Sequence, residues 1–161
     1  MNQDENISNI AIIEYYDIKE EELYKNKNTM PTSAYAIIKI QGQFLIGYNK
    51  YREQWEFPVG KIESGESAIE AARRELYEET HQIVDKLKFC GLFKVYDKVN
   101  KEYRFRAMYK GEADLLREFI PVEDDEMLGI RLWDFCDKSI YVDSVDTKMV
   151  ETLIQKNHIQ M

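Results

Sequence analysis

Residues 55–82, WEFPVGKIESGESAIEAARRELYEETHQ, constrain the fold of this chain more than any other stretch. Ser67 and Glu70 form the S-x-x-E pattern of a capping box, which predicts that a helix begins there. The apolar residues that follow recur at helical spacing: Ala68, Ile69, Ala72 and Leu76. Because most residues of this stripe are small, we expect the helix to lie close against a sheet.

The same helix carries three glutamates, Glu75, Glu78 and Glu79, spaced three and four residues apart on one side. Like charges at this spacing destabilise a helix by roughly 0.2 to 0.5 kcal/mol per pair. Arg74 can reach Glu70 and Glu78, each four residues away, but it cannot neutralise the whole group. A bound divalent cation could, and carboxylate oxygens are the ligands that Mg2+ and Mn2+ prefer.

Length and charge restrict the class of protein. A chain of 161 residues is the size of one domain, and no repeat or low-complexity linker divides it, so we expect a single domain over residues 1–161. The net charge of -8 argues against stable nucleic-acid binding or binding to an anionic membrane. No segment reaches the ~18 consecutive apolar residues that a membrane span needs. Cys90 and Cys136 have no metal-binding spacing and fit a reduced, cytoplasmic protein.

The rest of the chain predicts strands around this helix. Apolar and aromatic runs predict a strand over Ile10–Tyr16, a hairpin over residues 34–48 that turns near Gln41 and Gly42, and three strands over 86–96, 102–110 and 129–135. An amphipathic pattern predicts a second helix over residues 142–156, with Asp143 or Ser144 as its cap.

Residues 1–30 form an N-terminal extension. Residues 17–30 indicate a short acidic helix or an exposed connection, which ends at Pro31. The arm could serve as a homodimer contact or as a lid over a site. A loosely packed extension is the interpretation that we favour.

Residues 60–82 resemble the box of the Nudix hydrolases. That pattern is Gly, five residues, Glu, seven residues, Arg-Glu, an aliphatic residue, any residue, Glu-Glu, any residue, Gly and an aliphatic residue. Seven positions match it: Gly60, Glu66, Arg74, Glu75, Leu76, Glu78 and Glu79. The flanking WEFPVGKIESGE is similar to the MutT-like branch, which cleaves nucleoside triphosphates. The resemblance implies an α/β (α+β) fold, a Nudix α/β/α sandwich with a mixed β-sheet between helices.

The sequence departs from the box at its end, where His81 and Gln82 replace the glycine and the aliphatic residue. That glycine would stop the helix in the left-handed conformation, so its loss concerns the helix end and not the carboxylates. His81 could be a base or a metal ligand, but its position favours a substitute cap. Val59 precedes the box glycine and leaves Gly60 intact.

The resemblance also implies roles for the box residues. Glu75, Glu78 and Glu79 would ligate Mg2+ or Mn2+, with the Gly60 carbonyl as a further ligand. Arg74 would orient the glutamates, and Glu66 would lie beside the metals. Glu75 is our first choice as general base. An acid from a late loop serves in some family members, so Glu123 and Glu126 stay candidates, although a solvated turn explains the acidic run 123–126 as well.

Substrate contacts are less specific. Trp55, Tyr48, Phe57 and Phe105 could stack on a nucleotide base, but aromatic residues in strands are more often core. Lys61 could meet a phosphate. Arg104 and Arg106, two residues apart on one side of a strand, could bind a triphosphate or pair with the acidic surface.

These expectations favour a Mg2+-dependent hydrolase that converts a nucleoside triphosphate to a monophosphate and pyrophosphate, as an 8-oxo-dGTPase does. The same chemistry would serve ADP-ribose, dinucleoside polyphosphates or the 5' ends of RNA, of which long RNA fits the charge least. A nucleotide-binding regulator that has lost catalysis is the alternative from another class. Loss of catalysis usually removes the carboxylates, and all of them are present here.

Overall fold

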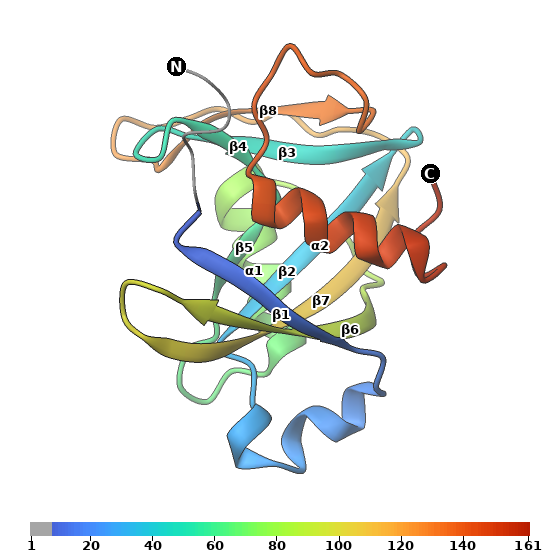
Figure 1. Ribbon diagram of the computed structural model, residues 1–161. Helices are drawn as coiled ribbons and strands as arrows, with labels where there is room; N and C mark the ends of the chain where they lie inside the picture. Colours follow the sequence, from blue (N-terminus) through green and yellow to red (C-terminus); the bar gives the residue numbers. More distant parts are fainter. Residues whose placement is uncertain (1–7) are drawn as a thin grey trace.

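The computed structural model describes residues 8–161, and it places an eight-stranded mixed sheet between two helices (Figure 1). The strands are β1 (Ile10–Tyr16), β2 (Ser33–Ile40), β3 (Gln43–Asn49), β4 (Gln54–Glu56), β5 (Val59–Lys61), β6 (Lys88–Asp97), β7 (Glu102–Ala113) and β8 (Met127–Trp133). The helices are α1 (Ala68–Thr80) and α2 (Ser144–Gln155), and Glu20–Tyr24 and Lys27–Thr29 form short 3-10 turns. The predicted sandwich is confirmed.

The sheet order is β1-β6-β7-β2-β3-β4, and β5 and β8 pair with β2 and β3 respectively. Strands β2 and β7 pair in parallel from Ser33↔Arg106 to Ile40↔Ala113, and the other pairs are antiparallel. The hairpin β2–β3 pairs only at Lys39↔Phe44 and Ile40↔Gln43. Toward the start of β2 the strands separate, and β5 takes the place of β3 beside it. This separation opens the sheet next to α1.

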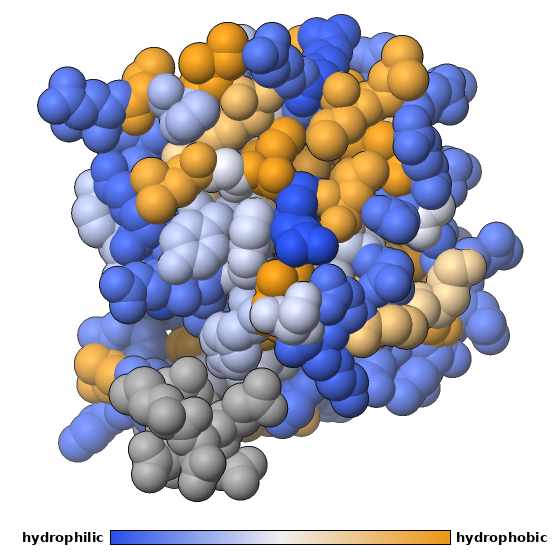
Figure 2. All heavy atoms as spheres, turned by 90° about the horizontal axis from the view of Figure 1, so that it is seen from above, coloured by the Kyte–Doolittle hydropathy of each residue, from blue (hydrophilic) through white to orange (hydrophobic). Residues whose placement is uncertain are grey.

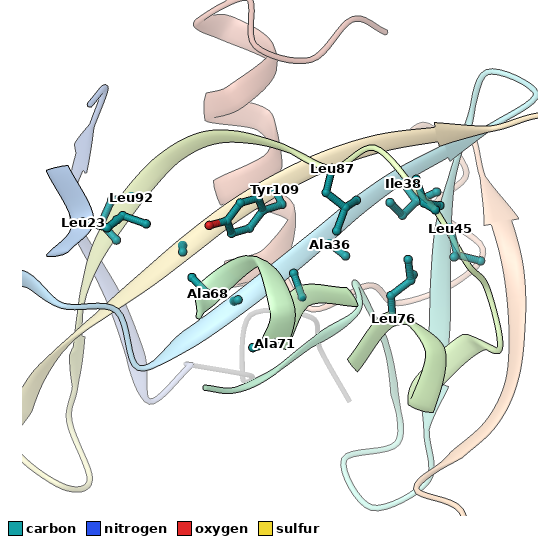
Figure 3. Close-up of a cluster of buried hydrophobic side chains, with 14 of the residues drawn as sticks. Leu23, Ala36, Ile38, Leu45, Ala68, Ala71, Leu76, Leu87, Leu92 and Tyr109 are labelled. Carbon is teal, nitrogen blue, oxygen red and sulfur yellow. The ribbon is translucent and has the colours of Figure 1, made fainter. Parts of the chain in front are cut away.

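Each helix buries a different face of the sheet. Helix α1 contributes Ala68, Ala71, Ala72 and Leu76 to one core, packed on Ile38, Leu45 and Tyr109 (Figure 3). Its small residues let the helix lie close to β2, as the sequence predicts. Helix α2 covers the other face with Val145, Met149, Val150 and Leu153, packed on Tyr35, Phe93 and Met108.

The end of each helix follows from local sequence. The Ser67 hydroxyl accepts a hydrogen bond from the Glu70 amide at 3.3 Å, which confirms the predicted cap of α1. His81 ends α1 in the left-handed conformation with φ 60°, which confirms it as the substitute for the box glycine. The Asp143 carboxylate accepts from the Asp146 amide at 2.9 Å and caps α2.

The predicted strand over Ile10–Tyr16 is confirmed, but the predicted loose packing of the N-terminal arm is wrong for its described part. Strand β1 pairs with β6 from Ile10↔Asp97 to Tyr16↔Leu92, and Leu23 is fully buried in the core beneath α1. An edge strand and a buried leucine make residues 10–24 part of the fold. Residues 1–7 lie outside the described residues, and the dimer contact or lid stays a prediction.

Several apolar side chains remain exposed in the loop before β8 and on β8 itself. Ile120, Val122 and Leu128 are more than half exposed. Figure 2 views the molecule from above, the side on which β8 lies in Figure 1, and shows apolar side chains gathered among hydrophilic ones. Within residues 8–161 no helix is long and apolar enough to cross a membrane.

Candidate active site

A cavity of about 1450 Å³ opens where β2 and β3 separate, and most of the predicted site residues line it. One wall comes from β5 and α1 and includes Gly60, Lys61, Glu66, Glu75 and Glu79. Arg52, Glu56 and Glu126 lie on a second wall, and Arg104, Arg106, Tyr35, Asp143 and Asp146 lie on a third. Residues from six elements and their loops therefore meet in one hollow.

Gly60 allows the closest contact in the site. A Cβ atom at this position would lie 2.0 Å from the carboxyl carbon of Glu75 and 2.2 Å from its Oε1. Any other residue would force the Glu75 side chain to move. The box glycine is thus explained by the approach of the box glutamate on α1 to strand β5.

Arg74 organises one group of carboxylates. Its Nε and Nη2 donate to both oxygens of Glu66 at 2.7 and 3.0 Å, and its Nη1 donates to Glu75 at 2.7 Å and to Glu78 at 3.2 Å. Nη2 also donates to the Lys61 carbonyl at 2.9 Å. The guanidinium beside Glu66 lowers the pKa of that carboxyl to about 2. Arg74 therefore ties the loop before α1 to the helix, and it does so through Glu66 and not through Glu70.

Arg52 organises a second group that the sequence analysis missed. Its Nε and Nη2 donate to Glu56 at 2.8 and 3.0 Å, and its Nη2 lies 3.4 Å from Glu126. Asn49 donates to the same Glu126 oxygen at 2.6 Å. The spacing of Arg52 and Glu56, four residues apart in a short charged loop that ends in a strand, is the local signal for this pair. Its link to Glu126, 74 residues later, has no local signal.

Glu79 lies between these two groups without a cationic partner among the described residues. Its Oε2 accepts one hydrogen bond, from the Val59 amide at 3.2 Å. Burial, followed by the charge of Glu75, raises the pKa of Glu79 well above its usual value, and Glu126 and Glu56 add to the effect. Burial is also the main cause that raises the pKa of Glu75, against the lowering effect of Arg74.

The predicted metal ligands are not clustered in the described structure. Among residues 8–161, no three carboxylate, thiol or imidazole side chains are arranged as a metal site. Arg74 holds Glu75 and Glu78, and the Glu78 side chain is 56% exposed, away from the cavity lining. Glu75 and Glu79 face the cavity together with Glu56 and Glu126.

This donor set nevertheless fits a divalent cation. Its groups are carboxylate oxygens, which suit Mg2+ and Mn2+, and the charges of Glu75, Glu126 and Glu56 act on the partly buried Glu79 carboxylate. A cation among them would offset the burial and the repulsion that together raise the pKa of Glu79. Glu75, Glu79 and Glu126 are the residues best placed to hold it.

Some predicted substrate residues lie elsewhere. Tyr48 and Trp55 pack against each other with ring centroids 5.4 Å apart, and neither is part of the cavity lining in the described chain. Phe57 and Phe105 are buried, Phe57 completely. Stacking of a base in this cavity on these four rings is therefore not supported. The Glu123 side chain is also absent from the described lining, which leaves Glu126 as the late-loop acid.

The predicted arginines do reach the cavity, each with a different partner. Arg104 lies 2.5 Å from Glu102 and 3.4 Å from Asp97. Arg106 donates to the Tyr35 hydroxyl at 2.9 Å, and this hydroxyl donates to Asp146 at 2.8 Å. Burial, with the charge of Asp143 next, raises the pKa of Asp146 well above its usual value. The chain Arg106–Tyr35–Asp146 was missed because its members lie 71 and 111 residues apart.

Gln82, the second departure from the box, fastens the long loop before β8 to the end of α1. Its side-chain amide donates to the Thr80 and Arg117 carbonyls at 2.9 and 2.8 Å and accepts from the Arg117 amide at 2.8 Å. The His81 ring packs on Phe119, 4.6 Å between centroids. The two residues that break the box pattern thus form contacts that a glycine and an aliphatic residue would lack.

Segments of this chain are similar to segments of known proteins. A segment of Bacillus subtilis (strain 168) YtkD, named as a candidate 8-oxo-dGTP diphosphatase, is 41% identical over 68 residues, 42% of each chain. A segment of the RNA pyrophosphohydrolase of Bartonella bacilliformis is 54% identical over 54 residues, 28% of this chain and 32% of that protein. The matches therefore span less than half the length of these relatives.

Solved structures extend the likeness to the whole fold. The Bacillus subtilis pyrophosphohydrolase BsRppH, as an E68A mutant, superposes with a TM-score of 0.66 at 23% identity, over 92% of this chain and 90% of that one. The Nudix domain of Shewanella oneidensis NrtR, in complex with ADP-ribose, superposes with a TM-score of 0.64 at 12% identity, over 88% and 100%. A sequence model of the NUDIX domain matches residues 30–143, from the end of the N-terminal arm to the cap of α2. The chain belongs to the NUDIX domain family.

Proposed function

We propose that this chain is a Mg2+- or Mn2+-dependent Nudix hydrolase that cleaves a diphosphate bond in a nucleotide, and that its main substrate is a nucleoside triphosphate, which gives a monophosphate and pyrophosphate. One observation carries the proposal: Gly60, Glu66, Arg74, Glu75 and Glu79 of the box line or support a single acidic cavity. We further propose that residues 1–161 act as one domain, with residues 60–82 as its catalytic segment.

The bound cation would supply the positive charge that phosphate oxygens require in a cavity lined by carboxylates, and it would make a nearby water more acidic. Glu75, Glu79 and Glu126 would hold the cation, with Glu78 and the Gly60 carbonyl as further ligands. Arg74 keeps the Glu75 carboxylate at a fixed place above Gly60 through the 2.7 Å contact.

Glu75 is our candidate for the group that takes the proton from the attacking water. Burial raises its pKa toward the working pH, which makes a carboxylate a better base. Glu126 is the alternative, since it lies in the same cavity and is fixed by Asn49. Arg104, Arg106 and Lys61 offer positive charge on the cavity wall to the phosphates farther from the scissile bond.

The preference for a triphosphate rests on the similarity of residues 55–66 to the MutT-like branch and on the segment shared with YtkD. RNA pyrophosphohydrolase relatives support removal of pyrophosphate from RNA 5' ends as the second candidate. The acidic charge of -8 keeps it second.

The test is product analysis with the purified protein and Mg2+. The panel contains the nucleoside triphosphates with 8-oxo-dGTP, ADP-ribose, a dinucleoside polyphosphate and a 5'-triphosphorylated RNA. We expect pyrophosphate and a monophosphate from a triphosphate, and loss of turnover in Glu75→Gln and Glu78→Gln. Pyrophosphate release that neither substitution affects would refute the site. Tight nucleotide binding by calorimetry without any turnover would favour the regulator.

A further inference from the structure

Four lysines surround a second cavity, at the end of the sheet opposite the acidic cavity. This hollow of about 440 Å³ is lined by Lys39 of β2, Lys86 before β6, Lys88 of β6 and Lys110 of β7, together with residues 157–160 after α2. Its only acidic lining residue among the described ones is Glu112. We call it the lysine cavity.

This concentration of positive charge is unusual in the chain. The protein has 30 acidic residues against 22 lysines and arginines, yet four lysines and only one acidic residue of the described chain line this hollow. Four ammonium groups around one hollow repel one another, so an anion among them is favoured.

Two of the four lysine side chains are hydrogen-bonded to the backbone. Lys110 donates to the His158 carbonyl and Lys39 to the Gln160 carbonyl, so these side chains are directed at the segment that follows α2. The accepting carbonyls follow α2, which ends at Gln155, so the two contacts fasten the segment after the helix to the sheet. Lys86 and Lys88 are exposed and donate to no group within residues 8–161. The fold therefore does not depend on a hydrogen bond from either of these two side chains.

The lysine cavity is separate from the acidic cavity. Arg106 and Lys110 lie on the same side of β7, four residues or about 13 Å apart at the usual rise of a strand. Met108 lies between them and is completely buried beneath α2. The two cavities are therefore separated by a buried part of β7.

We propose that the lysine cavity binds a small phosphate-bearing anion, of the size of pyrophosphate. The ammonium groups would donate charge-assisted hydrogen bonds to the phosphate oxygens. The volume falls in the range typical of small-molecule sites. This site does not depend on the proposed catalytic function, since none of its residues lines the acidic cavity.

The test is a titration followed by 15N-1H correlation spectra, in buffer with a chelator so that no divalent cation assists the acidic cavity. Gly111 lines the lysine cavity and Gly60 lines the acidic one, so their amide signals report the two sites separately. Pyrophosphate and a nucleoside monophosphate are titrated separately, which tells whether the free anion or a nucleotide is preferred. We expect saturating shifts at Gly111 and its neighbours.

Two double variants test whether binding depends on the lysine cavity itself or only on the number of positive charges on the protein. Lys86→Gln/Lys88→Gln should weaken binding by about tenfold or more, because each loses a charge-assisted hydrogen bond. Lys98→Gln/Lys101→Gln removes the same charge from the exposed turn between β6 and β7, and its affinity should stay within about twofold.

Three outcomes would overturn the proposal. One is shifts confined to Gly60, another is shifts that grow linearly without saturation, and the third is equal weakening in both double variants. A short 5'-phosphorylated RNA gives a further test. If it shifts the Gly111 signal and pyrophosphate does not, the ligand of the lysine cavity is a nucleic acid and not a small anion.

Discussion

Gly60→Ala should abolish most activity while it leaves the fold intact. The added Cβ would lie 2.0 Å from the Glu75 carboxyl carbon, where ordinary contacts begin at 3.4 Å, so the carboxylate must move by about 1.4 Å. A displacement of ~1 Å in a catalytic group costs on the order of 10²-fold in rate, and we expect a loss of that size in kcat. Glu75 would also lose its 2.7 Å contact with Arg74, worth about 1 to 3 kcal/mol of stability.

The assay is steady-state turnover of the best substrate with Mg2+, together with thermal unfolding. Gly129→Ala is the matched control, because a Cβ there meets no atom within 4 Å. Glu75→Ala removes the conflict, so Gly60→Ala should cost little more stability in that background. A Gly60→Ala protein with kcat within about twofold of the wild type would refute the argument that the glycine exists to admit Glu75.

Two further perturbations follow from the buried polar contacts. Burial raises the pKa of Asp146 above its unfolded value of about 3.9, so folding takes up a proton above that pH and stability falls as pH rises toward the folded pKa. Asp146→Asn should therefore flatten the decline of the melting temperature as the pH rises above about 4, and an unchanged slope would contradict the assignment. Gln82→Leu should cost about 1 to 3 kcal/mol, because it breaks the contacts to Thr80 and Arg117, and hydrogen exchange should speed up at the Arg117 amide. An unaltered exchange rate there would show that Gln82 does not hold the loop.

The elements with local signals were predictable from the sequence. Ser67 caps α1 and His81 ends it, and each effect involves residues within one helical turn. The Gln41–Gly42 turn is equally local, and both of its residues have positive φ. The spacing of the box residues predicted correctly that Gly60 and Glu75 lie in one cavity, because both residues belong to the same motif.

Contacts between distant parts of the chain were not predictable. Composition marks Trp55 and Tyr48 as aromatic, but only the pairing of β3 with β4 shows that they face each other outside the cavity. The strand over Ile10–Tyr16 was predicted, but its pairing with β6, more than 70 residues away, was not. The contacts of Arg74 with Glu75 and Glu78 were predicted only in part. Four carboxylates compete for this one guanidinium, and the sequence does not show which of them it contacts.

Glu79 is a cavity carboxylate without a cationic partner among the described residues, and the proposed cation binding depends on it most. The most direct test is the melting temperature of the wild type and of Glu79→Gln at increasing Mg2+ or Mn2+. A cation that binds only the folded state adds about 2.7 kcal/mol at 100 times its Kd, roughly 5 to 11 °C for a chain of this size. The account predicts that rise in the wild type and loss of most of it in Glu79→Gln. No rise at saturating metal, or an equal rise in both proteins, would contradict it.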